Sequence, residues 1–175
     1  MNQQLLNKYF ADVWKPSTSG FGETGFNLAN EIQDDEWVLD VGCGYNEFKG
    51  KIKNLVGIDP GCEQADIVTT IEDYKPDRLF DVAFCLGSLN FGQGDIVPNQ
   101  ISKVVSCMKP KSRIYWRVNP GLYDHDSKLC EKCDFYPWDS ELLDFFAVQH
   151  GYKCVTIQDD SNGKNYRLYA EWVRD

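Results

Sequence analysis

The sequence predicts an α/β domain with a doubly wound, mostly parallel sheet, an antiparallel C-terminal hairpin and helices on both faces. Short apolar segments alternate with helical segments from residue 37 to residue 150. Strands that are apolar along their whole length are typical of a parallel sheet covered on both sides. After residue 150, two apolar segments flank Asn162-Gly163, a dipeptide typical of hairpin turns.

Five apolar segments are expected to form the parallel strands. They span residues 37–41, 55–59, 67–68, 80–85 and 114–118. Only residues 60–66 separate the second segment from the third, whereas a parallel crossover needs about a dozen residues or more. Either the third strand is vestigial or the crossover helix is missing, so we expect a reduced version of the fold.

Apolar positions at helical spacing predict four helices around these strands. They span residues 5–14, 23–32, 98–108 and 138–150, and the final hairpin strands span 153–157 and 166–173. Lys15-Pro16 should end the first helix, because the residue before proline avoids helical backbone. Gly151 is expected to be a left-handed C-terminal cap.

The length of 175 residues suits one domain. We expect residues 1–32 to form a helical lid and residues 35–175 to form the core. No apolar run approaches the roughly 18 residues of a membrane helix, and the first residues do not resemble a signal peptide. The chain has seven cysteines, an odd number that favours reduced thiols. The sequence therefore predicts a cytoplasmic protein with no membrane association.

The charge balance argues against nucleic acid as a partner. Acidic residues outnumber basic ones 27 to 18, and the formal net charge is −9. Unaided binding to nucleic acid depends on neutralising phosphates with lysine and arginine. Lys103 to Arg113 contain a small basic group, which is more typical of a solvated helix end.

The most informative segment follows the first strand and reads Asp40-Val41-Gly42-Cys43-Gly44-Tyr45-Asn46. Glycines at 42 and 44 allow a sharp turn and let a ligand lie against the backbone. The second strand ends in Asp59, nineteen positions after Asp40 (59 − 40 = 19). A carboxylate at this place can accept hydrogen bonds from both ribose hydroxyls of a nucleoside.

At these residues the chain resembles the class I S-adenosylmethionine-dependent methyltransferases, which have a Rossmann-like fold. The family's first motif is an apolar strand followed by Asp-x-Gly-x-Gly-x-Gly, and here Asn46 replaces the last glycine. Asparagine tolerates left-handed backbone better than most residues, so the turn can survive. Val56 to Pro60 resemble the second motif.

The resemblance continues through the fourth and fifth strands and covers roughly residues 35–118, plus the closing helix and hairpin. Residues 80–90 resemble the family's fourth strand and the loop that lines the methyl donor. Residues 104–114 are similar to its helix, Lys-Pro-Gly-Gly turn and fifth strand. Lys111 and Ser112 replace the two glycines, so a different turn is expected there.

The resemblance implies S-adenosylmethionine as cofactor and S-adenosylhomocysteine as its product. It implies that Asp40, Gly42, Cys43 and Gly44 contact the amino acid end of the donor and that Asp59 binds the ribose. Pro60 would flank the adenosine, and Thr70 and Ile71 would contact adenine. Cys85, Leu86 and Gly87 would border the sulfonium, mainly through backbone atoms.

Related functions are less consistent with these motifs. A dinucleotide fingerprint would need glycine where Glu47 stands, and a carboxylate there would repel a pyrophosphate. Leu86 to Asn90 differ from the Asn/Asp-Pro-Pro-Tyr motif of DNA amine methyltransferases and from the Pro-Cys of cytosine carbon-5 enzymes. That loop also lacks the acids that an aminopropyl transferase would need for a polyamine.

Two further residue groups have alternative interpretations. His125, Cys130 and Cys133 include a Cys-x-x-Cys pair, but a structural zinc site needs four ligands, so we expect no metal. Tyr9, Trp14 and Phe21 could cover the donor with ring faces that attract a sulfonium. Core packing is at least as good an interpretation for Tyr9, and Trp14 and Phe21 are better candidates for a lid.

The expected reaction is methyl transfer to a small molecule or a protein side chain. Such a displacement depends mainly on alignment, helped by a base when the acceptor carries a proton. The candidates for a catalytic role are weak: Asn90, Asn119, Asp124 and His125. A non-catalytic donor-binding module that serves a partner protein is the alternative. The sequence leaves the acceptor and the oligomeric state open.

Overall fold

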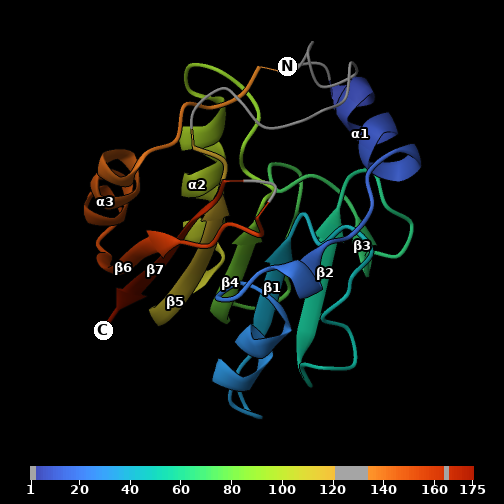
Figure 1. Ribbon diagram of the computed structural model, residues 1–175. Helices are drawn as coiled ribbons and strands as arrows, with labels where there is room; N and C mark the ends of the chain where they lie inside the picture. The colour runs from blue at the N-terminus through green and yellow to red at the C-terminus, as the bar shows by residue number, and fades with distance from the viewer. Residues whose placement is uncertain (1–2, 121–133, 164–165) are drawn as a thin grey trace.

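The computed structural model describes residues 3–120, 134–163 and 166–175, which form one seven-stranded sheet with the strand order β3-β2-β1-β4-β5-β7-β6 (Figure 1). The strands are β1 (Val38–Val41), β2 (Leu55–Asp59), β3 (Ile67–Val68), β4 (Phe80–Leu86), β5 (Met108–Val118), β6 (Lys153–Asp159) and β7 (Leu168–Arg174). The first five strands pair in parallel, and β7 pairs antiparallel with both β5 and β6. The doubly wound fold class and its C-terminal hairpin are therefore confirmed.

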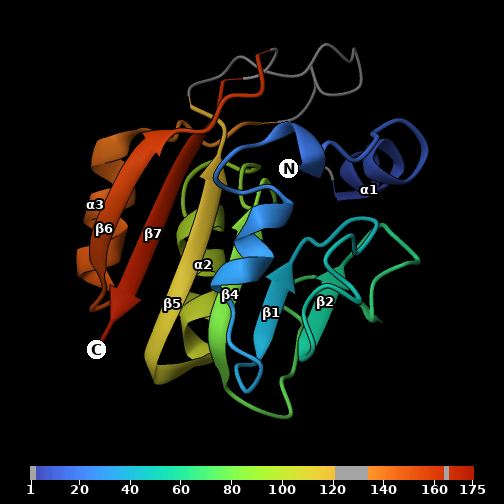
Figure 2. The same cartoon turned by 60° about the horizontal axis from the view of Figure 1, so that its bottom comes forward.

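Two α-helices cover one face of the sheet, where the larger core lies. They are α2 (Ile96–Ser106) and α3 (Ser140–Gln149), which lie behind the sheet in Figure 2. α2 buries Val97, Ile101 and Val104, spaced four and three residues apart as one helical face requires. α3 begins at Asp139, whose side chain accepts the backbone N–H of Leu142 at 2.7 Å.

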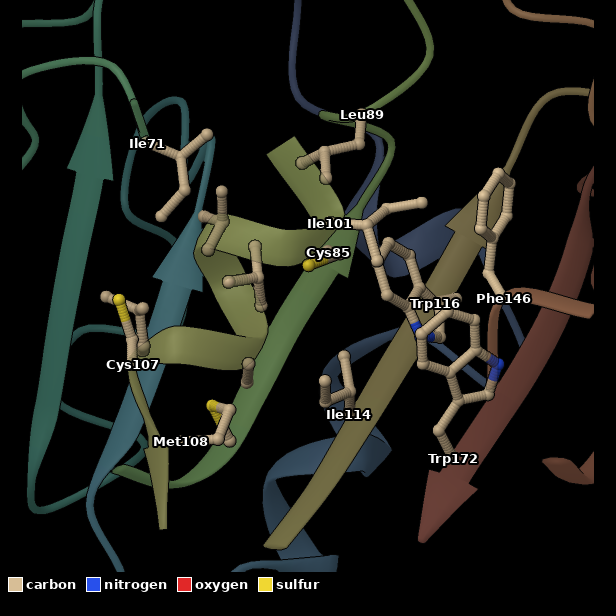
Figure 3. Close-up of a cluster of buried hydrophobic side chains, with 14 of the residues drawn as sticks. Ile71, Cys85, Leu89, Ile101, Cys107, Met108, Ile114, Trp116, Phe146 and Trp172 are labelled. Atoms are coloured by element: carbon tan, nitrogen blue, oxygen red, sulfur yellow. The ribbon is translucent and has the colours of Figure 1, made fainter. Parts of the chain in front are cut away.

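Tryptophans from neighbouring strands fill the part of this core beneath α3. Trp116 of β5 and Trp172 of β7 have ring centroids 4.5 Å apart, and both side chains are fully buried (Figure 3). Figure 3 also shows Cys85 and Ile114 in this layer, together with Ile101 of α2. The carboxyl ends of β4 and β5 are thus supported by a rigid layer of large side chains.

The opposite face of the sheet carries a smaller core built on Val38, Val82, Phe84 and Tyr115. Successive residues of each strand therefore alternate between the two cores, as the pleat requires. A 3₁₀ helix, Phe26–Glu31, packs on this second face where the sequence predicts an α-helix over 23–32. The difference has a local cause: the chain turns so tightly at Gly25 that a Cβ would lie 2.2 Å from the Phe21 carbonyl oxygen. Only six residues then remain, too few for a stable α-helix.

The N-terminal helix α1 spans Gln3–Asp12, close to its predicted range, and lies beyond the carboxyl ends of β1 and β2 (Figures 1 and 2). The segment between β2 and β3 contains no helix, and β3 has two residues. The fold is therefore reduced, as expected. The missing part is the crossover helix between β2 and β3, and all seven strands of the sheet are kept. None of the helices in the described ranges is long and apolar enough to cross a bilayer.

The connection before the fifth strand differs from the family's glycine turn, as the replacement of both glycines predicts, and β5 already begins at Met108, before its expected start at residue 114. Without the two glycines, Lys111 and Ser112 stay extended, and Ser112 pairs with Arg174 of β7. The Arg174 guanidinium also donates to the carbonyls of Lys109 and Pro110. Proline is tolerated here because the pairing of β5 with β4 is irregular beside Phe80.

Candidate active site

A deep cleft lies across the carboxyl ends of β1, β2, β4 and β5, where open α/β sheets bind ligands. Its floor is the turn after β1 together with the residues that end β2 and β4. Its roof comes from α1 and the segment that follows it. Ten of the residues predicted to contact a donor line it: Asp40, Gly42, Cys43, Gly44, Asp59, Pro60, Thr70, Ile71, Leu86 and Gly87.

The turn after β1 adopts the left-handed backbone that its glycines predict. Gly42, Gly44 and Asn46 have φ values of 69°, 53° and 56°. Asn46 therefore replaces the glycine of the motif without changing the turn, and its amide donates to the Gln64 carbonyl at 3.1 Å. At Gly42 a Cβ would lie 2.3 Å from the Cβ of Ser88, so this position has no room for a side chain.

Asp59 joins the end of β2 to that turn. Its Oδ2 accepts the backbone N–H of Gly44 at 3.0 Å. Its Oδ1 accepts the backbone N–H groups of Gly61 and Cys62 at 2.7 and 2.9 Å. A carboxylate has about four lone-pair sites, so these backbone groups engage three of them and one Oδ2 site remains. Two ribose hydroxyls need two acceptor sites. One hydroxyl would therefore have to share a lone pair of Asp59 with one of these backbone N–H groups.

Asp40 is a buried carboxyl on the cleft wall, with 4% of its surface exposed. Burial raises the pKa of Asp40 to about 7, and the Arg117 cation only partly offsets this effect. A cationic ligand beside Asp40 would therefore stabilise the ionised form of its carboxyl group.

Arg117 projects from the end of β5 and holds several segments together. Its Nη1 donates to the hydroxyl of Thr24 at 3.0 Å, and its Nη2 donates to the Leu86 carbonyl at 2.9 Å. The guanidinium lies over the ring of Phe21, 3.9 Å from the centroid. Burial lowers the pKa of Arg117 to about 10, and the negative charges of Asp160 and Asp40 offset this effect only in part.

Buried polar contacts fix the N-terminal segment over this wall. Asp160, in the connection after β6, accepts the backbone N–H of Glu23 at 2.8 Å and also binds Thr24. Thr18 donates to Glu47 at 2.5 Å. The segment between α1 and β1 is thus tied to the hairpin connection, to β5 and to the turn after β1.

Aromatic side chains form the roof of the cleft. Phe10, Trp14 and Phe21 line it, whereas Tyr9 is buried and is absent from the lining. Trp14 lies near both Phe10 and Tyr45, with ring centroids 5.9 Å from each. Trp14 and Phe21 therefore lie at the cleft, as the lid interpretation expects, and Tyr9 does not line it. The lid itself remains a prediction.

The remaining candidates are placed differently. Cys85 does not line the cleft, because strand alternation turns its side chain into the core beneath α2, where burial raises the pKa of its thiol (Figure 3). Asn119 lines the cleft, and its backbone N–H donates to the buried Asn90 side chain at 3.0 Å. Asp124 and His125 lie outside the described residues.

The metal expectation concerns residues of the same undescribed segment. His125, Cys130 and Cys133 all lie outside the described residues. Over residues 3–120, 134–163 and 166–175, no group of histidine, cysteine or acidic side chains could hold a metal ion. The absence of zinc therefore remains a prediction.

Sequence reasoning did not assign Arg117 or Thr18 to the site, and it expected Ser88 only in the wall of an acceptor pocket formed by residues 88–92. A signal existed for Arg117, which interrupts the apolar run 114–118 near the end of a buried strand. Ser88 and Thr18 lie in loops, where a hydroxyl is common and carries no comparable signal.

No protein-family model matches the chain, and no curated protein matches it. Solved structures do match. The 1,6-didemethyltoxoflavin-N1-methyltransferase of Burkholderia thailandensis, with bound S-adenosylhomocysteine, aligns at a TM-score of 0.73 and 12% identity, over 98% of this chain and 88% of that one. The magnesium protoporphyrin IX methyltransferase of Synechocystis, with bound S-adenosylmethionine, aligns at 0.73 and 13% identity, over 100% and 98%.

A third similar structure is the complex between the Haloferax volcanii Trm112 methyltransferase activator and a methyltransferase described as unconfirmed. It aligns at a TM-score of 0.65 and 13% identity, over 81% of this chain and 83% of that one. At these identities the similarity establishes the fold, which is that of class I S-adenosylmethionine-dependent methyltransferases. The activity has to be argued from the site.

Proposed function

We propose that this chain is a methyltransferase that uses S-adenosylmethionine to methylate a small molecule or a protein side chain. The observation that carries the proposal is the convergence of the glycine turn, Asp40 and Asp59 on one cleft at the carboxyl ends of β1 and β2. The glycine turn and Asp40 were predicted from the first motif and Asp59 from the second, and Gly42 and Gly44 carry no side chain that would fill the cleft.

The cleft residues suit the parts of the donor. Asp40 complements the ammonium, and the turn from Gly42 to Gly44 lies against the amino acid chain. Asp59 binds the ribose through its free Oδ2 site, beside Pro60. Thr70 and Ile71 adjoin adenine, and the sulfonium lies near Leu86 and Gly87.

When bound, the donor supplies an electrophilic methyl group that an acceptor lone pair displaces in line. The protein's main contribution is alignment and exclusion of water, which can supply a large part of the rate. Phe10, Trp14 and Phe21 cover the cleft for this purpose. Asn119 is the best placed of the candidate polar groups, with Asn90 behind it. Asp124 and His125 remain candidates for a base.

The acceptor is a small molecule or a protein side chain. The acidic balance of the chain supports this over nucleic acid. Two similar structures belong to enzymes named for small acceptors, a didemethyltoxoflavin and magnesium protoporphyrin IX. We propose that residues 88–92 and 119–138, together with the lid around residues 14–21, form the walls of the acceptor site.

We also propose a cytoplasmic location. Every cysteine in the described ranges is free, which supports a reducing compartment. The only partner that we propose is the methyl acceptor, and the oligomeric state has to be measured in solution.

The test is transfer of a radiolabelled methyl group to fractionated cell material. We expect label in a small-molecule or protein fraction, and no label with the Asp40→Asn variant. Label found mainly in purified nucleic acid at physiological salt would contradict the acceptor class. Tight S-adenosylhomocysteine binding without transfer to any fraction would favour the non-catalytic donor-binding module.

A further inference from the structure

Arg117 has hydrogen-bonding capacity that the protein leaves unused. The guanidinium carries five N–H groups. Nη1 binds Thr24, and one Nη2 N–H binds the Leu86 carbonyl. In the described part of the chain, Nε–H has no acceptor. The unused edge, Nε with Nη2, is the one that binds a carboxylate in bidentate geometry.

This unused edge lies beside Gly87, on the wall of the cleft. A Cβ at Gly87 would be 3.7 Å from Nη2 and 3.9 Å from Nε, and Gly87 has a φ of 95°. Gly87 and Arg117 both line the cleft. The absence of a side chain at 87 therefore leaves the edge open to a ligand.

A second unused donor lies nearby. The hydroxyl of Ser88 is buried and has no partner among the described residues, and it also lines the cleft. A Cβ at Gly42 would be 3.3 Å from this hydroxyl oxygen, so the hydroxyl lies against the glycine turn. A buried hydroxyl without a partner is costly unless a ligand satisfies it.

We propose that Arg117 and Ser88 bind the α-carboxylate of the donor, opposite the Asp40 carboxylate that binds its ammonium. The cleft then holds both charges of an amino acid zwitterion, and the carboxylate adds to the negative charges of Asp160 and Asp40 that already act on the buried Arg117. Arg167, a further cation on the cleft wall, adds positive potential at Arg117. This inference rests on the proposed function and names the residues that select the amino acid end of the donor.

The experiment is calorimetry with three probes. S-adenosylhomocysteine has both charges, its α-methyl ester lacks the carboxylate charge, and methylthioadenosine lacks the amino acid end. We expect the wild type to bind S-adenosylhomocysteine roughly tenfold or more tightly than the ester, the range of a charge-assisted hydrogen bond. In Arg117→Gln this ratio should fall to within about twofold, with little change for methylthioadenosine.

Two further variants separate recognition from folding. The Ser88→Ala variant loses a hydroxyl that has no partner among the described residues, so the protein should fold normally. The ratio of its affinities for S-adenosylhomocysteine and the ester should still fall. Arg113→Gln, which removes an ion pair with Glu36 in the middle of β5, is the matched control and should leave the ratio unchanged. A purely structural role of Arg117 would weaken all three probes alike.

An unchanged ratio in both Arg117→Gln and Ser88→Ala would overturn the inference, as would a wild type that does not discriminate the ester. If the wild type binds none of the three probes, the proposed function itself fails. The two failures are therefore distinguishable.

Discussion

The carboxylate of Asp59 accepts the backbone N–H of Gly44 at 3.0 Å, so the residue that ends β2 also holds the turn that follows β1. The two motifs that predict nucleoside binding are thus physically coupled. Asp59 therefore holds the turn in position, and its remaining Oδ2 lone pair can bind a ligand.

Asp59→Ala should weaken S-adenosylhomocysteine binding by roughly 1.5–3 kcal/mol, the scale of hydrogen bonds to a charged group. Calorimetry on protein that keeps its wild-type circular dichroism measures this loss. The exposed Asp35, changed to alanine, is the control. Unchanged affinity in folded Asp59→Ala would contradict the ribose assignment.

Asn46→Ala should destabilise the protein by about 1–2 kcal/mol, because alanine has a Cβ penalty in left-handed backbone. The change also removes the hydrogen bond to Gln64. Asn46→Gly should lose less, since glycine adopts the same φ freely. Urea unfolding compares the two variants, and equal stability of Asn46→Ala and the wild type would show that the turn does not constrain this residue.

Gly42→Ala should be far more damaging than Gly50→Ala. Both glycines have positive φ, 69° and 80°, so backbone strain is similar. Only at Gly42 does the new Cβ overlap another atom, 2.3 Å from Ser88, while nothing lies within 4 Å at Gly50. We expect Gly50→Ala to lose about 1 kcal/mol of stability and keep ligand binding. Gly42→Ala should lose binding altogether, and wild-type affinity for S-adenosylhomocysteine in this variant would refute the close approach at the turn.

The raised pKa of Asp40 predicts a pH dependence of stability. Burial raises this pKa from 3.8 to about 7, so the folded protein holds a proton that the unfolded chain loses. The stabilising contribution is present below the ordinary pKa and is lost as pH rises toward 7. Asp40→Asn should therefore gain stability relative to the wild type between pH 5 and pH 8, as urea unfolding at both values would show. Asp35→Asn is the control, and a pH-independent difference for Asp40→Asn would contradict the prediction.

Ligand binding should show the opposite trend. The ammonium of S-adenosylhomocysteine needs ionised Asp40, so affinity should rise with pH up to about 7 and then level off. The rise should approach tenfold per pH unit well below that pKa. Calorimetry from pH 5 to pH 8 measures it, and a flat profile for the wild type would argue against contact between Asp40 and the ammonium.

Local sequence signals predicted the parts of the fold that depend on local patterns. The apolar run of β4 and the spacing of Ile101 and Val104 in α2 each indicate one element directly. The turn at Asn46 was predictable because few residues tolerate positive φ. The 3₁₀ helix was not, because it results from a tight backbone approach at Gly25 that the sequence does not display.

Side-chain direction limited what could be predicted of the site. Cys85 was expected to border the donor mainly through backbone atoms, and the alternation of β4 directs its side chain into the core while Leu86 and Gly87 line the cleft. Arg117 became visible as a site residue only when β5 was placed beside β4, since its partners Thr24 and Leu86 are distant in sequence. Tertiary contacts of this kind cannot be read from spacing alone.

The central claim is that the cleft binds a nucleoside methyl donor, and its most direct test is calorimetric titration of the wild type with S-adenosylhomocysteine and with NAD. We predict saturable one-to-one binding of S-adenosylhomocysteine and none of NAD, because Glu47 stands where a pyrophosphate would need a glycine. Binding of NAD, or no binding of S-adenosylhomocysteine to folded protein, would contradict the account.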